Sequence, residues 1–71
     1  MGVQMIPVSS STIVAVGYDD VNRKLYVEFR NGTYVYYSVP RHVFDGLMAA
    51  YSHGEYHAAY IKNSYRYDRV G

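Results

Sequence analysis

The chain is short, nearly neutral in charge and rich in tyrosine. Ten of its 71 residues are tyrosine, cysteine and tryptophan are absent, and seven Lys and Arg against six Asp and Glu leave a net charge of +1. These numbers predict one small domain over residues 1–71, and they exclude a disulfide framework, a thiolate nucleophile and a cysteine zinc site. The charge balance also excludes the strongly basic footprint of a duplex-binding protein.

The N-terminal region has no charged side chain through residue 18. Pro7 and the run Ser9–Ser11 interrupt its apolar character and no basic residue precedes it, so it fits neither a signal peptide nor a membrane span. Ile6 stands where a myristoylation signal needs Ser or Thr. We therefore expect residues 1–10 to form an N-terminal lead, and the protein to be cytoplasmic without a membrane partner.

Two strands are predicted in the first half of the chain. Residues 12–18 are β-branched and apolar on both faces, as in a strand buried on both sides, and Asp and Asn side chains over residues 19–22 favour a turn. Residues 24–30 alternate apolar and polar side chains with period two, which is the clearest strand pattern of the chain. The side chains of its apolar face are Leu25, Val27 and Phe29.

A hairpin is predicted next. The dipeptide Asn31-Gly32 favours a two-residue type I′ turn because both residues tolerate positive φ, and residues 33–37 return as the third strand. In this register Val27 pairs with Tyr36. The core face then holds Tyr34 and Tyr36, and the opposite face holds Tyr26, Val35 and Tyr37. A three-residue loop with a bulge would exchange the two faces.

Two short helices are predicted after the sheet. Pro40 suits a first helical turn, and apolar side chains then recur at helical spacing through Ala50. Gly54 interrupts the chain, and residues 55–63 form the second helix. The side chains expected to face the sheet are Val43, Phe44, Leu47 and Tyr51, then Tyr56, Ala59 and Tyr60. The expected fold is α+β: a three-stranded antiparallel β-meander followed by two short α-helices packed on one face.

The C-terminal segment mixes cations with aromatic rings, and residues 64–71 are expected to form a polar tail. The residues that carry this mixture are Lys62, Tyr65, Arg66, Tyr67 and Arg69. Cations interleaved with rings suit phosphate contact combined with base or ribose stacking. The alternative is a solvated tail whose tyrosines pack back on the sheet.

The sheet tyrosines form two further groups. Tyr26 and Tyr37 are expected on the face that the helices leave open, where they would suit either a stacking platform for single-stranded nucleic acid or the seam of a homo-oligomer. Tyr34 and Tyr36 are expected at the rim of the core, with their hydroxyls satisfied locally.

Catalytic and metal motifs are weak. His53 and His57 are four residues apart, but Gly54 between them indicates a helix boundary and no third ligand is evident. No serine has a His and an acid at a recognisable motif spacing, and no Gly-rich phosphate loop follows a strand. We expect no enzyme activity, no cofactor and no metal.

Several motifs together resemble the KTSC domain family. They are Ser11, Val16-Gly17-Tyr18-Asp19, Leu25-Tyr26-Val27-Glu28-Phe29, Tyr34-Val35-Tyr36-Tyr37-Ser38-Val39-Pro40, Val43-Phe44 and Ser52-His53-Gly54, followed by Ile61 and Tyr65. The resemblance covers about residues 9–70. That family is named after a domain at the C-terminus of some lysyl-tRNA synthetases and also occurs as small stand-alone proteins of bacteria and their phages. The resemblance implies a bacterial or phage-encoded RNA-binding module, and it brings no catalytic residues.

Tyrosine-rich surfaces bind partners more often than they catalyse reactions. We therefore expect a non-catalytic binding module for a nucleotide-type ligand, either single-stranded RNA or a small or cyclic nucleotide, held by tyrosine stacking and C-terminal cations. A homo-oligomer that sequesters a nucleotide signal between subunits fits the size, charge and tyrosine content together. The alternative is a protein–protein interaction or structural oligomerisation module with no nucleotide ligand.

Overall fold

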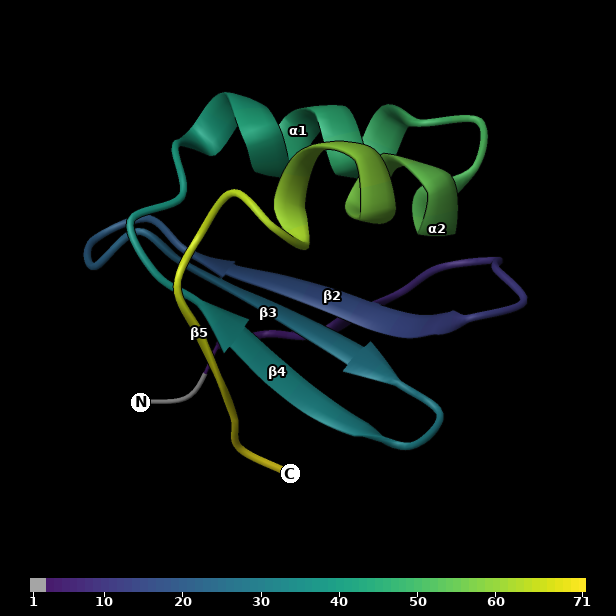
Figure 1. The fold of residues 1–71 in the computed structure, drawn as a ribbon, viewed down its shortest axis with the longest axis horizontal. Coiled ribbons are helices and arrows are strands. Elements are labelled where there is room, and N and C mark those ends of the chain that lie inside the picture. The colour runs from purple at the N-terminus through teal and green to yellow at the C-terminus, as the bar shows by residue number, and fades with distance from the viewer. Residues whose placement is uncertain (1–2) are drawn as a thin grey trace.

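The computed structural model describes residues 3–71 and shows an antiparallel sheet with both helical segments on one face (Figure 1). The five strands follow chain order across the sheet: β1 Ile6–Pro7, β2 Ile13–Asp19, β3 Lys24–Phe29, β4 Gly32–Tyr36 and β5 Tyr67–Arg69. The helices are α1, Arg41–Ala49, and α2, His53–Tyr56, which continues as a π-helical turn η1, His57–Ile61. The α+β class is confirmed, but the expected three strands are five.

The two additional strands come from segments expected to lie outside the sheet. In the N-terminal lead, Ile6 of β1 pairs with Val16, and in the C-terminal tail, Tyr67 of β5 pairs with Tyr36. Strands of two and three residues are too short to show period-two alternation in the sequence. They form because the outer strands of a meander present unpaired N–H and C=O groups, which the chain ends satisfy.

The β3–β4 hairpin has the predicted faces but a different register. Its loop consists of Arg30 and Asn31, with Phe29 paired to Gly32, so the predicted Asn31-Gly32 turn is wrong. Val27 pairs with Tyr34 instead of Tyr36, a slip of two residues. Because side chains alternate with period two, a slip of two residues leaves every side chain on its predicted face. Gly32 has φ +153°, a conformation that favours glycine.

The opposite face of the sheet is partly covered. Val35 points away from the helices, as its pairing with Tyr26 requires, yet it is only 3 % exposed. The segment before β1 lies close to this face, because a Cβ atom on Gly17 would come within 2.7 Å of Val3 and 2.9 Å of the Gln4 carbonyl oxygen. Less of this sheet face is therefore open to solvent than the sequence analysis expected.

Helix α1 buries most of the apolar side chains that were predicted to face the sheet. The second helical segment turns a different face than predicted toward the sheet. Leu47 and its neighbours Val43 and Phe44 are buried, but Tyr51 is fully exposed because α1 ends at Ala49. In the second segment the buried residues are His57 and Ile61 rather than Ala59 and Tyr60. A π-helical turn holds more residues than an α-helical turn, so a face assigned with a 3.6-residue period is displaced.

Within residues 3–71, no helix is long and apolar enough to cross a lipid bilayer.

The close approach of residues 3–5 to β2 yields a stability prediction. We expect Gly17→Ala to destabilise the fold by roughly 1–3 kcal/mol, because the new Cβ would crowd both a side chain and the backbone oxygen of Gln4. Urea unfolding followed by circular dichroism measures the change. Gly71→Ala is the matched control, since its Cβ would lie 3.4 Å from Thr33, an ordinary contact. Equal stability of the two variants would show that the N-terminal segment does not pack on Gly17.

Candidate aromatic cleft

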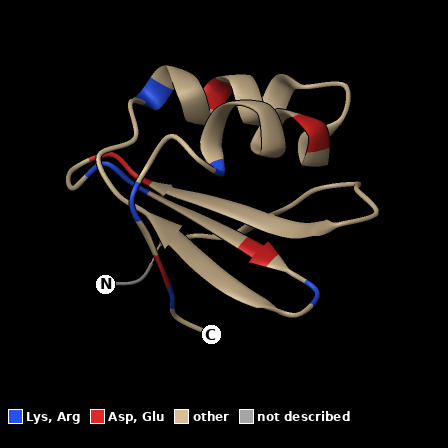
Figure 2. Cartoon of the chain, viewed as in Figure 1, with Lys and Arg blue, Asp and Glu red and all other residues tan. Residues whose placement is uncertain are grey.

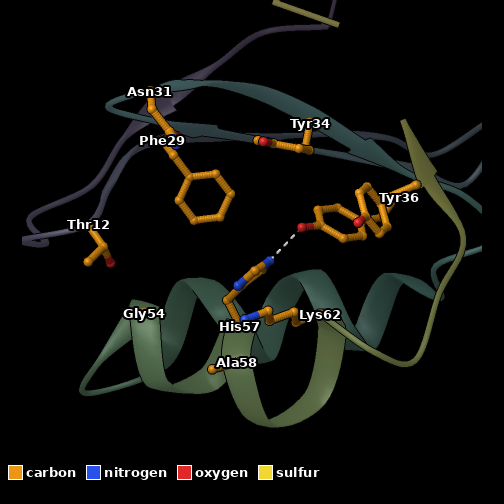
Figure 3. A pocket seen from close by; sticks show the side chains of 10 residues that line it. Thr12, Phe29, Asn31, Tyr34, Tyr36, Gly54, His57, Ala58 and Lys62 are labelled. Carbon is orange, nitrogen blue, oxygen red and sulfur yellow. Dashed lines mark hydrogen bonds between the residues drawn. The ribbon is translucent and has the colours of Figure 1, made fainter. Parts of the chain in front are cut away.

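A cleft of about 420 Å³ lies between the second helical segment and the outer strands of the sheet (Figure 3). We call it the aromatic cleft. The side chains that define it come from β3, the hairpin loop, β4, η1, the turn after η1 and β5: Phe29, Asn31, Tyr34, Tyr36, His57, Lys62 and Tyr67. It therefore combines segments from the middle and the C-terminal end of the chain.

A hydrogen-bonded pair forms the floor of the cleft. The Tyr36 hydroxyl lies 2.7 Å from Nε2 of His57, and both residues are buried. Phe29 packs edge-on against the His57 ring, with centroids 5.0 Å apart. Edge-to-face packing with neighbouring rings fixes the imidazole orientation, because both aromatic partners restrict its rotation. The pair links the end of β4 directly to η1.

Burial keeps this pair neutral. It raises the pKa of Tyr36 to about 12, with smaller contributions from Tyr67 and Tyr34. Burial also lowers the pKa of His57, and the positive charge of Lys62 adds to that effect. At neutral pH the phenol is therefore protonated and the imidazole is uncharged.

A neutral Tyr–His pair carries two protons, one on the hydroxyl and one on the ring, and their mutual hydrogen bond uses one of them. If the hydroxyl donates to Nε2, the proton on Nδ1 remains; if Nε2 donates, the hydroxyl proton of Tyr36 remains. Neither residue makes a second side-chain hydrogen bond to any part of residues 3–71. In either tautomer, one donor of the pair therefore has no acceptor within residues 3–71.

The sheet side of the cleft is aromatic. Cross-strand pairing places Tyr67 beside Tyr36, and their ring centroids are 5.6 Å apart. Tyr34 lies 5.9 Å from Tyr67 and 5.8 Å from Phe29, again between centroids. Tyr67 is 53 % exposed, so one of these rings presents free surface.

Two cations lie at the cleft in different roles. Lys62 lines it and is exposed. The guanidinium of Arg69 lies 6.0 Å from the Tyr34 ring and donates hydrogen bonds to the carbonyl oxygens of Asn31 and Gly71. Arg69 therefore closes the hairpin tip against the chain end, whereas Lys62 makes no side-chain hydrogen bond to another described residue.

The predicted ligand-binding residues separate into two groups. The cleft holds Lys62 and Tyr67, with Arg69 beside them, and it also includes Tyr34 and Tyr36, which were expected at the rim of the core. The remaining predicted residues lie elsewhere: Tyr26 on the opposite sheet face, and Tyr37, Tyr65 and Arg66 around a separate hollow of about 340 Å³. Tyr37 donates to Asp68 at 2.7 Å, and Tyr65 packs against the core.

Sequence reasoning missed Phe29, Asn31 and His57 as cleft residues. Phe29 was expected in the core and is instead partly buried at the cleft. The sequence did hold one indication that His57 is buried, because His57 lies four residues before Ile61. These two residues form the buried face of η1. His53 does not join it, because Nδ1 of His53 contacts the Leu47 carbonyl at 2.8 Å. Across residues 3–71 no three potential ligands group as a metal site would require.

The comparison with known proteins gives a family and a fold. The sequence model of the KTSC domain matches residues 9–65. The chain belongs to the KTSC domain family. A protein of Tsukamurella paurometabola is 46 % identical over 63 residues, which cover 87 % of this chain and 94 % of that protein. The crystal structure of a KTSC domain protein from Yersinia pestis, 39 % identical, superposes with a TM-score of 0.96 over 99 % of this chain and all of the other. The resemblance inferred from the motifs is confirmed, and the five-stranded KTSC fold holds the cleft.

The buried His57 predicts a pH-dependent stability. Its pKa is lowered on folding from an ordinary value near 6.5, so the unfolded chain takes up a proton at a higher pH than the folded chain does. Stability from this group is complete above about pH 6.5 and declines as the pH falls through that value. We expect the melting temperature to drop between neutral pH and pH 5, and His57→Gln to remove that drop.

His42→Gln is the matched control, because His42 is exposed on α1. It should retain the pH dependence of the parent protein. Asp19, whose pKa is lowered by hydrogen bonds from Asn22, loses its contribution only in the more acidic range where carboxylates titrate. An unchanged slope above pH 5 in His57→Gln would contradict the assignment of this transition to His57.

Proposed function

We propose that this KTSC domain is a non-catalytic binding module for a nucleotide-type ligand and that the aromatic cleft is its site. The observation that carries the proposal is a single cleft that combines exposed aromatic surface, a cation and a donor without a protein acceptor. Its volume of about 420 Å³ falls within the range of small-ligand sites. A nucleotide supplies the matching groups: a planar ring, a phosphate and several hydrogen-bond acceptors.

In this proposal each part of such a ligand has a matching group in the cleft. The base stacks on the exposed face of Tyr67, and Tyr34 lines the same aromatic side. Stacking of this kind contributes roughly 1–3 kcal/mol per base. Lys62 meets the phosphate, and the free donor of the Tyr36–His57 pair meets an acceptor on the base or the ribose.

The charge distribution favours a small ligand or a short single strand. Figure 2 shows basic and acidic residues interspersed along the chain, consistent with a net charge of only +1. A long polyanion is held by many cations acting together, whereas one or two suffice for a single phosphate group. The raised pKa of Tyr36 also makes its phenol a weak nucleophile, in keeping with binding rather than catalysis.

The alternative function is protein–protein interaction or structural oligomerisation without a nucleotide. Exposed tyrosines such as Tyr60 and Tyr67 support it, since tyrosine is enriched at protein interfaces. Thermal stabilisation separates the two functions. A ligand that binds only the folded state raises the melting temperature as its concentration rises, whereas a module without a small-molecule site shows no such dependence.

Two substitutions test the cleft in different ways. Lys62→Ala should lower affinity and flatten the dependence of affinity on salt, because a phosphate contact that releases counterions is lost. Tyr67→Ala should lower affinity about 5- to 100-fold with little change in salt dependence, because stacking has little ionic character. Calorimetric titration of mononucleotides, cyclic dinucleotides and short single-stranded RNA at two salt concentrations measures both effects.

Lys24→Ala and Tyr26→Ala are the matched controls, since Tyr26 and its neighbour Lys24 belong to β3 and do not line the cleft. Both should bind like the parent protein. If the parent binds a nucleotide and the cleft variants bind it equally well, the ligand occupies another surface. If the parent binds none of the panel, protein–protein interaction becomes the better function.

We also propose that the protein forms a homo-oligomer. A 71-residue domain without disulfides has a small core, and Tyr26 and Tyr37 remain partly exposed on the face opposite the helices. Light scattering coupled to size-exclusion chromatography should give at least twice the monomer mass at micromolar concentration. A strictly monomeric mass would remove the oligomer and any cleft completed by a second subunit.

A further inference from the structure

Another hollow, of about 320 Å³, lies against the helices and shares no lining residue with the aromatic cleft. Its aromatic residues are Tyr51, Tyr56 and Tyr60, and Glu55 is the one charged residue that lines it in the described chain. We propose that this hollow, the tyrosine cage, binds a small alkylammonium ion such as a quaternary ammonium. This proposal is independent of the nucleotide site.

Two rings of the tyrosine cage are held in place by the helices. Tyr56 and Tyr60 are one helical turn apart, and their ring centroids are 4.8 Å apart with planes inclined by 50°. The hydroxyl end of Tyr56 lies against α1, where the absence of a side chain at Gly46 makes room for it. The third ring belongs to Tyr51, which stands fully exposed just after the end of α1.

The outward side of the packed rings offers a place for one small cation. A cation binds an aromatic face when it lies within about 6 Å of the ring centroid. The Tyr56 and Tyr60 rings pack against each other with centroids 4.8 Å apart, so the ion lies over their outward side and not between them. Tyr51 lines the same hollow and can close on the ion from the loop.

The residues that line the hollow favour a positively charged ligand. The faces of tyrosine rings carry negative electrostatic potential, and the Glu55 carboxylate adds a full negative charge. An anionic phosphate is therefore disfavoured here. A quaternary ammonium ion is weakly hydrated and has apolar methyl groups, so it gains ring contacts at a small desolvation cost.

This occupant also explains the exposed aromatic surface. Tyr51 and Tyr60 are 106 % and 60 % exposed, and both line the same hollow. Grouped exposed aromatic residues mark binding sites more often than isolated ones do. The absence of a basic residue from the lining leaves the Glu55 charge available for a cation.

The test uses choline and its neutral isostere 3,3-dimethylbutan-1-ol, in which carbon replaces the quaternary nitrogen. Nuclear magnetic resonance titration of the parent protein should give saturable shifts at Tyr51, Tyr56 and Tyr60 with choline, and at least about fivefold weaker binding of the isostere. Sodium chloride at matched ionic strength is the reference. Equal binding of both compounds would overturn the proposal, because the hollow would then be an apolar patch without preference for charge.

Variants separate the cage from other surfaces. Tyr60→Ala and Glu55→Gln should each weaken choline binding at least about fivefold, whereas Tyr60→Phe should retain it because the ring face remains. Tyr67→Ala, in the aromatic cleft, should bind choline like the parent protein. Choline shifts centred on the cleft, unchanged binding in Tyr60→Ala, or no saturable shift up to the solubility limit would each overturn the proposal.

Discussion

The hydrogen bond between Tyr36 and His57 is the contact on which the arrangement of this domain depends. It joins the end of β4 to the first residue of η1 at 2.7 Å, inside the core. A buried hydroxyl or imidazole without a partner is costly, so each group requires the other. Their pairing holds the second helical segment over the sheet and so keeps the aromatic cleft open between them. The same bond uses only one of the two protons of the pair, so one donor remains without an acceptor in the described chain.

The sequence predicted the interior of the sheet well and its edges poorly, for separate physical reasons. The faces of Tyr34 and Tyr36 were correct although the turn was misplaced, because a slip of two residues preserves alternation. The strands β1 and β5 were missed because two or three residues carry no readable period. The buried face of η1 was assigned wrongly because the wider π-helical turn brings His57 and Ile61 inward. The edge strands depend on backbone pairing with distant segments, whereas η1 depends on a local change of helix geometry.

The candidate site was predicted in part. Strand alternation explains why some of the predicted C-terminal residues lie at the cleft and others do not. From the sequence, the C-terminal cations and aromatic residues are predicted to form one polar tail, because β5 is not recognisable as a strand. Once Tyr67 and Arg69 pair with β4, their side chains join Tyr34 and Tyr36 on the helix side, while Asp68 turns to the other face and accepts a hydrogen bond from Tyr37. Composition indicated the chemistry of the segment, but only the pairing shows which of its residues act together.

The placement of Tyr67 on a short edge strand has a consequence for dynamics. β5 has three exposed residues and lies at the edge of the sheet, where it pairs on one side only, so it belongs to the part of the fold that opens at a low free energy. One wall of the cleft is therefore able to detach while the core stays folded. Under the proposed function, separation of β5 from β4 would open the cleft to a nucleotide, and a base stacked on Tyr67 would in turn hold β5 in the sheet.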